Sequence, residues 1–178
     1  MQHLWAPWRM DYIQGQAGRP PDGECVFCWA ARQSSDGPHN LVVFRGRHNY
    51  VILNRFPYTG GHLMVVPYAH VDDLASLAPE VRAEMMELAA RAVRILRAEY
   101  HPQGFNLGMN LGRIAGAGIA EHVHLHVVPR WAGDTNFMTT VGQARVLPEA
   151  LDKTYARLRA AWTRAPASGT GPPAEPSA

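Results

Sequence analysis

The first 130 residues alternate between short apolar runs and polar turns that contain glycine or proline. Runs of four to seven residues rich in valine, isoleucine and leucine, bounded by such turns, are typical of β-strands. The first two runs are joined by a polar segment of five residues, which predicts a hairpin. The pattern predicts five strands, at residues 41–44, 50–53, 62–66, 105–110 and 122–128.

Residues 79–100 carry a helical period instead. Their apolar side chains recur every three or four positions, at Val81, Met85, Leu88, Ala92 and Leu96. Pro79 suits the first turn of a helix. A second helix is predicted at residues 148–162. Together these elements predict an α+β fold, with an antiparallel sheet of about five strands, one long central helix and a C-terminal helix.

The length of 178 residues fits one domain, and a hydrophobic content of 47% supports a core. We assign that domain to residues 1–164. Residues 165–178 contain almost no large apolar side chain and are rich in proline and glycine. Because such a segment buries too little surface to offset its ordering entropy, we expect a disordered tail.

The charge balance excludes some partners. The formal net charge is +2, and no long basic run occurs, which argues against nucleic-acid or membrane binding. No apolar stretch reaches the roughly 20 residues of a membrane span. The first residues carry neither a charged segment nor an apolar one of the signal-peptide kind. We therefore expect a cytoplasmic protein.

Three histidines, His122, His124 and His126, occupy every second position of the last predicted strand. In a strand they would share one face, while the valines and leucine between them face the other. Imidazoles titrate near neutral pH, bind metals and act as nucleophiles. A row of three can therefore hold a metal, shuttle protons or supply a nucleophilic nitrogen.

A glycine-rich segment at residues 112–118 precedes the histidines. Such loops let backbone N–H groups approach an anion. Phosphate held against imidazole favours phosphoryl or nucleotidyl transfer. The alternative is a zinc hydrolase whose catalytic metal is bound by all three histidines.

Cys25 and Cys28 are the two cysteines of the chain and form a Cys-x-x-Cys pair. A redox pair would need a βαβ context, which the predicted elements lack. A structural disulfide does not suit a reducing compartment. Zinc needs two further ligands. Packing of free thiols as small apolar groups is the remaining alternative.

The run 122–128 matches the pattern His-φ-His-φ-His-φ-φ, in which φ is apolar. Residues 54–67 and 105–112 extend the match, so that the chain resembles the histidine triad (HIT) superfamily over residues 24–131. The segments 4–12 and 129–131 resemble the bacterial branch that includes diadenosine tetraphosphate phosphorylases and hydrolases. The resemblance implies an α+β fold that pairs into a homodimer.

The resemblance also implies roles for single residues. His124 would be the nucleophile that forms a nucleotidyl-histidine, and His126 would act on the leaving-group side, where a protonated imidazole would balance negative charge. The residues implied to bind the nucleotide are Asn54, His62, Asn110, Gly118, Ile119 and Ala120. Trp131 is a further candidate, because an aromatic ring can stack on a base, and a core tryptophan is the alternative. The loop departs from the glutamine and hydroxyl found in many relatives, because it has Gly116-Ala-Gly-Ile119 there.

In members with a Cys-x-x-Cys pair, two histidines complete a structural zinc site. The matching residues are His70 and His122, so the resemblance implies zinc bound by Cys25, Cys28, His70 and His122, and no organic cofactor. The first triad histidine would then be a metal ligand.

The function implied is cleavage of a dinucleoside polyphosphate, with diadenosine tetraphosphate foremost, at its α-phosphate. Phosphate or water would accept the nucleotidyl group, and Arg113 or Arg130 would line an anion pocket for phosphate. One alternative is an adenosine phosphoramidate hydrolase. Another, of a different class, is a non-catalytic nucleotide sensor.

Overall fold

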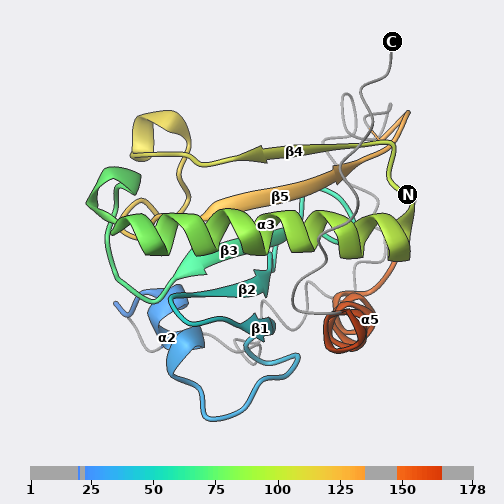
Figure 1. Cartoon of the computed structure of the whole chain (residues 1–178), viewed down its shortest axis with the longest axis horizontal. Helices are drawn as coiled ribbons and strands as arrows, with labels where there is room; N and C mark the ends of the chain where they lie inside the picture. The colour runs from blue at the N-terminus through green and yellow to red at the C-terminus, as the bar shows by residue number, and fades with distance from the viewer. Residues whose placement is uncertain (1–19, 21–22, 135–147, 166–178) are drawn as a thin grey trace, which may run out of the picture.

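The computed structural model describes residue 20 and residues 23–134 and 148–165. Within them one antiparallel sheet has the strand order β1-β2-β3-β5-β4. Long helix α3 crosses this sheet, and α5 lies beyond the β1 side (Figure 1). The strands are β1 Val42–Arg45, β2 Asn49–Leu53, β3 Leu63–Pro67, β4 Gly104–Gly108 and β5 Leu125–Arg130. The predicted α+β fold is confirmed.

The hairpin of β1 and β2 is held at its turn by a carboxylate from α3. Glu84 accepts hydrogen bonds from the backbone N–H groups of Arg47, His48 and Asn49 at 2.7–2.8 Å. Burial by itself would raise the pKa of Glu84, but these bonds and one from the Asn49 side chain lower it. The turn is thereby fixed to the helix that crosses the sheet.

Helix α3, Pro79–Tyr100, begins with proline in its first turn, as its sequence predicts. It ends at His101, whose backbone lies in the left-handed region with φ 47°. Its apolar stripe packs on β2, β3 and β5. Met85, Leu88, Ala92 and Leu96 are buried there, together with the valines of β3.

Helix α5, Leu151–Arg164, covers the edge strand β1. Tyr155 and Arg159 of α5 donate hydrogen bonds to the carbonyls of Val42 and Val43. Strand β4 is the other edge of the sheet, and its side chains are half-buried or exposed. The two edges therefore differ, because only one of them is covered by a described helix.

Two of the predicted elements are wrong in detail. The strand expected at residues 122–128 begins only at Leu125, so His122 and His124 lie in the segment before β5. Their positions are therefore not set by the alternation of a strand. The second helix starts three residues later than predicted, at Leu151.

The sequence patterns also missed the short helix α2, Val26–Arg32. Seven residues give too few turns for a recognisable period. Its last turn is held by Arg45, which donates to the carbonyls of Ala30, Ala31 and Gln33. Strand β1 thus fixes the helix that carries the cysteine pair.

Of the predicted tail 165–178, only Ala165 is described, and its carbonyl accepts a hydrogen bond from Arg91. The rest of the tail and the segment 4–12 lie outside the described residues. Among the helices that are described, none combines the length and apolar character needed to cross a membrane. The cytoplasmic location stays a prediction.

Candidate active site and metal centre

The three histidines of the triad face different surroundings. His122 is 1% exposed and turns toward the cysteines of α2. His124 is 6% exposed and lies between the other two. His126 lies on β5 and lines a cleft. The row therefore does not converge on one point, and the three-histidine catalytic metal site is not formed by the described residues.

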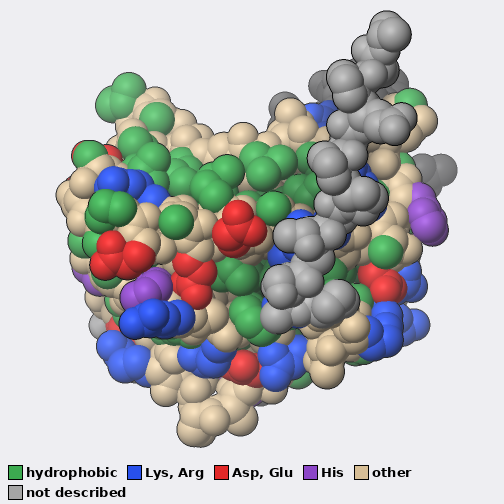
Figure 2. All heavy atoms as spheres, in the orientation of Figure 1, with side chains coloured by type: hydrophobic (Ala, Val, Ile, Leu, Met, Phe, Trp, Pro, Cys, Tyr) green, Lys and Arg blue, Asp and Glu red, His purple; other side chains and the backbone are tan. Residues whose placement is uncertain are grey.

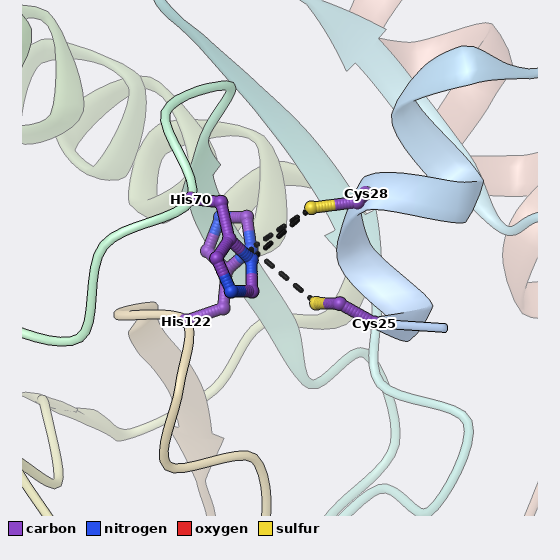
Figure 3. A group of neighbouring side chains, drawn as sticks. All are labelled: Cys25, Cys28, His70 and His122. Atoms are coloured by element: carbon purple, nitrogen blue, oxygen red, sulfur yellow. Dashed lines mark hydrogen bonds between the residues drawn. The ribbon is translucent and has the colours of Figure 1, made fainter. Parts of the chain in front are cut away.

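Four side chains from three segments gather at one end of the sheet (Figure 3). Cys25 precedes the first residue of α2 and Cys28 lies within it, His70 follows β3, and His122 precedes β5. Their ligand atoms all lie within 4.8 Å of one another. The sequence expectation for these four residues is thus matched by their placement.

The spacing of these atoms suits a tetrahedral metal. His122 Nδ1 lies 3.4 Å from Cys25 Sγ, 3.6 Å from Cys28 Sγ and 3.3 Å from His70 Nδ1. Cys28 Sγ lies 3.2 Å from His70 Nδ1. Ligand atoms of a tetrahedral site with bonds of about 2.0–2.3 Å are separated by roughly 3.3–3.8 Å. Four of the six separations in the cluster are therefore close to those of a tetrahedral metal site.

The protonation of His122 is fixed from behind. Its Nε2 lies 2.9 Å from the carbonyl oxygen of Pro67, and a carbonyl can only accept. Nε2 therefore carries the proton, and Nδ1 presents its lone pair to the cluster. This is the outer hydrogen bond that metal-binding histidines commonly make.

The pKa of the Cys28 thiol depends on whether a cation is bound in the cluster. Without one, burial and the neighbouring Cys25 raise the pKa of the Cys28 thiol to about 11. A divalent cation reverses that preference, because metal ligands bind as thiolates. The donor set of two sulfurs and two imidazoles is the one typical of structural zinc.

His124 is held in the tautomer that a nucleophile needs. Its Nδ1 lies 2.8 Å from the carbonyl oxygen of His122, so Nδ1 carries the proton. The other nitrogen, Nε2, keeps its lone pair. Burial lowers the pKa of His124, which keeps the ring neutral. A neutral imidazole with one fixed N–H and one free lone pair can attack phosphorus.

His126 receives its orientation from His62. The backbone N–H of Tyr58 donates to His62 Nδ1 at 3.1 Å, so the proton of neutral His62 lies on Nε2. That Nε2 lies 2.9 Å from Nδ1 of His126, which must therefore accept. The proton of His126 is left on Nε2. His126 thus offers an N–H donor on its other side.

The charge of His126 differs from the sequence expectation. Burial, followed by the neighbouring His124, lowers the pKa of His126 to about 4. The ring is therefore neutral near pH 7 in the absence of a ligand. Its contribution to a negatively charged ligand is a hydrogen bond from Nε2–H, and not the full positive charge that the sequence suggested.

His62 reaches its place through a glycine. Gly61 has φ +78°, and a Cβ added there would lie 3.0 Å from Leu96 of α3. Only glycine suits both restrictions. His62 itself is 0% exposed and is bonded to Tyr58 and His126. The structure thus places it behind His126, whereas the resemblance placed it at the nucleotide.

A cleft of about 810 Å³ opens on the β4–β5 side of His126. Its volume lies within the range of ordinary ligand sites. Of the residues predicted to bind nucleotide, Asn110 and Trp131 line it. The indole N–H of Trp131 donates to the Tyr100 carbonyl at 3.3 Å, which fixes the ring at the far end of the cleft.

The remaining predicted contacts lie elsewhere. Asn54 is half-buried, and its amide nitrogen lies 3.4 Å from His62 Nδ1. Gly118, Ile119 and Ala120 follow the short turn η2, Arg113–Ala115, and do not line the cleft. Their backbone N–H groups make no hydrogen bond to another described residue. Their role as an anion cradle stays a prediction.

Two residues of the site carry no sequence signal that we used. Phe27 stands between the cysteines, and its ring centroid lies 5.4 Å from that of His122 and 4.8 Å from that of His124. Pro67 acts through its carbonyl alone. An apolar residue inside Cys-x-x-Cys and a proline at a strand end look like ordinary packing and punctuation. Their contacts with the histidines become visible only in the folded structure.

Comparison with known proteins places the chain in a family. The family model for the HIT domain matches residues 38–133. The chain belongs to the HIT domain family. The matched segment contains the three histidines, His62 and His70, whereas the cysteine pair lies before it.

Relatives of this HIT chain include a named enzyme. A protein of Mycobacterium tuberculosis named AP-4-A phosphorylase is 42% identical over 171 residues, which are 93% of this chain and 87% of that protein. The crystal structure of a zinc-bound histidine triad family protein from Mycobacterium smegmatis has a TM-score of 0.64 and 31% identity. It covers 79% of this chain and 94% of its own. A diadenosine triphosphate hydrolase of Plasmodium falciparum shares the fold at 17% identity, with a TM-score of 0.56.

Proposed function

We propose that this HIT chain is an enzyme that cleaves diadenosine tetraphosphate or a similar dinucleoside polyphosphate through a nucleotidyl-histidine on His124. The observation that carries the proposal is the bond from His124 Nδ1 to the His122 carbonyl, which leaves Nε2 as the nucleophile. The neighbouring His126 lies 4.8 Å away between ring centroids and opens onto the cleft. The relative named AP-4-A phosphorylase supports the same substrate class.

The reaction has two displacements. In the first, His124 Nε2 bonds to the α-phosphorus, and the bond from that phosphorus to the bridging oxygen breaks. With diadenosine tetraphosphate the electron pair leaves on ATP, and AMP remains on His124. In the second, an oxygen of phosphate or water bonds to the same phosphorus, the P–N bond breaks, and the acceptor's proton passes to solvent.

His126 assists from the side of the leaving group. Its Nε2–H donates a hydrogen bond to a phosphate oxygen where negative charge develops. His62 holds that ring in place through the bond to Nδ1. The described residues thus divide the work: His124 forms the covalent bond, His126 donates a hydrogen bond, and His62 positions the donor.

The acceptor we propose is inorganic phosphate, so the products would be ATP and ADP. The name of the Mycobacterium tuberculosis relative supports phosphorolysis. Arg113 is exposed on the turn η2, next to the loop expected to hold phosphate. Chromatography of products with and without millimolar phosphate tests this. AMP without ADP at millimolar phosphate would exclude phosphorolysis and leave the covalent mechanism intact.

A substrate panel separates the proposal from its alternatives. Adenosine phosphoramidate would form the same intermediate on His124, so its turnover alone would favour the phosphoramidate hydrolase. Binding of nucleotides with no turnover of any substrate would favour the sensor. Rapid quench with labelled diadenosine tetraphosphate is expected to trap a nucleotidyl adduct on the wild-type chain.

We further infer that the cluster of Cys25, Cys28, His70 and His122 holds structural zinc. The support is its tetrahedral spacing and the zinc-bound relative from Mycobacterium smegmatis. When bound, zinc would supply folding energy that fixes α2 against the segment before β5. Elemental analysis of protein made with zinc present should give about one zinc per chain.

Strand β4 pairs with only one strand, β5, among the described residues, and this edge supports the proposed homodimer. Leu107 lies on β4, Leu111 and Ile114 follow it in the chain, and all three side chains are exposed, as is Met86 of α3. Figure 2 shows apolar side chains gathered over α3 and β4, below a hollowed rim. An unpaired edge invites a strand from a second copy. Sedimentation of the wild type and of Leu107→Lys tests this, with a shift from dimer to monomer expected for the variant.

A further inference from the structure

The cleft has a direction, which is set by the alternation of β5. His126, Val128 and Arg130 share one face of that strand and line the cleft in this order. Four residues of strand span roughly 13 Å. The cleft therefore leads from the donor His126 to a guanidinium well beyond the reacting phosphate.

No side chain of β4 lies directly opposite His126 on the neighbouring strand. The partner of His126 across the strands is Gly108 of β4, and a Cβ added there would meet nothing within 4 Å. Asn106 faces Val128 one step further along. An extended group leaving from His126 thus has room to lie along β4 and β5.

Arg130 is held in a fixed orientation at the end of this path. Its Nε and one terminal nitrogen donate to the two oxygens of Asp134 at 2.6 and 2.8 Å. The other terminal nitrogen donates to Asn106 Oδ1 at 2.7 Å. A guanidinium has five N–H donors, so two remain for a ligand. Its side chain is 43% exposed.

Arg130 also differs in charge from the other residues that line the cleft. Among the described residues that line it, Arg130 is the only arginine or lysine. Two carboxylates also line it. Asp134 is paired with Arg130, and Glu149 accepts from Tyr100 and pairs with Arg157. His126 is neutral near pH 7, so the permanent positive charge of this lining lies on Arg130.

We propose that Arg130 binds the distal phosphates of the leaving nucleotide and so selects substrates with a long polyphosphate leaving group. The proposal rests on the proposed function, because it takes His124 as the point of attack. A planar fork with two free donors suits phosphate oxygens. Asp134 and Asn106 are positioning residues that aim this fork. In the sequence analysis Arg130 was a candidate to bind the acceptor phosphate. Because Arg130 lies four residues along β5 from His126, we place it at the leaving group instead.

The test compares two substrates that share one adenylyl group. Diadenosine tetraphosphate carries a long anionic leaving group, and adenosine phosphoramidate carries a small one. Arg130→Gln is expected to lower kcat/KM for the tetraphosphate roughly 10- to 100-fold, as for loss of one charged hydrogen-bonding partner. Its kcat/KM for adenosine phosphoramidate should stay within about twofold of the wild-type value. Arg130→Lys should fall between, because it keeps the charge and loses the fork.

Arg94→Gln is the matched control, since Arg94 is an exposed arginine of α3 that does not line the cleft. Arg94→Gln should change kcat/KM for neither substrate. An equal loss on both substrates in Arg130→Gln, together with a lower melting temperature, would mean a structural role and would overturn the proposal. No loss on the tetraphosphate would also overturn it.

Binding supplies a readout that does not need turnover. In calorimetry, Arg130→Gln should bind ATP roughly 10-fold or more weakly than the wild type and should bind AMP with unchanged affinity. Equal ATP affinity in wild type and variant would refute the role of Arg130. If the wild type turns over adenosine phosphoramidate but not diadenosine tetraphosphate, the proposed substrate is wrong. The ATP and AMP affinities of the wild type and Arg130→Gln then still show whether Arg130 binds the distal phosphates.

Discussion

The metal cluster and the cleft lie at opposite ends of one run of histidines, yet they are built differently. The cluster joins three chain segments around His122, which is 1% exposed. The cleft is lined by edge strand β4 and by β5, with His126 at its inner end. In the proposed function, two residues of the same type, four positions apart, would therefore serve stability in one case and chemistry in the other.

The difference lies in the partner behind each ring. The Pro67 carbonyl leaves the lone pair of His122 on Nδ1, which faces the cluster, and the His122 carbonyl leaves the lone pair of His124 on Nε2, the proposed nucleophile. His62 leaves His126 with a donor. Roles in this triad thus follow from three hydrogen bonds, and each can be removed separately.

The largest expected effect separates chemistry from stability. His124→Ala should lower turnover of diadenosine tetraphosphate by at least about 1,000-fold, because the covalent path loses its nucleophile. Metal content should not change, since His124 is outside the cluster. Steady-state turnover, rapid quench and elemental analysis on the same preparation check this. Near-normal turnover of the variant would end the covalent mechanism.

The opposite pattern is expected at the cluster. Cys25→Ser should lower zinc content and reduce the melting temperature by several degrees, because the energy of metal binding appears as folding energy. Surviving folded protein should keep more of its specific activity than His124→Ala does. His39→Gln, which removes an exposed imidazole outside the cluster, serves as the control. Full zinc content in Cys25→Ser would contradict the assignment of that ligand.

A smaller effect should follow from releasing His126. His62→Phe keeps a ring and removes the donor to His126 Nδ1, so we expect kcat to fall roughly 10- to 100-fold with a smaller change in KM. His62→Gln should restore part of the loss, because its amide can donate again. A purely structural role would lower the melting temperature and leave the kcat of the folded fraction intact.

The smallest effect concerns pH. The pKa of His126 is about 4 in the folded chain and about 6.5 in an unfolded one. As pH falls between these values the unfolded chain binds the proton first, so stability is complete above about 6.5 and declines toward 4. Urea unfolding at pH 7 and pH 5 measures this slope. His126→Asn should reduce this slope without abolishing it, because burial also lowers the pKa of His122 and of His124. An unchanged slope would assign the pH dependence to groups other than His126.

Much of this molecule is predictable because its signals are local. The strands β1, β2 and β3 follow from apolar runs and turns, and α3 from its period and Pro79. The spacing of Cys25 and Cys28 is compatible with half of a zinc site, and the family resemblance supplied the other two expected ligands, His70 and His122. Each of these inferences needs only residue types at fixed separations.

The rest depends on contacts that no local pattern encodes. The start of β5 at Leu125 was missed because alternation continues through His122 and His124, while the strand does not. The tautomers depend on carbonyls that the fold brings into place, such as that of Pro67, 55 positions before His122. The neutral state of His126 depends on burial, which a sequence does not show.

Phe27 has a consequence for anyone who redesigns this protein. Its ring packs against both His122 of the cluster and His124, the proposed nucleophile, and its own carbonyl accepts a hydrogen bond from Tyr50. The cysteine helix and the catalytic segment therefore share one wall. A variant that replaces the four residues of the cluster with apolar side chains must keep Phe27, because the same ring also packs against His124, the proposed nucleophile.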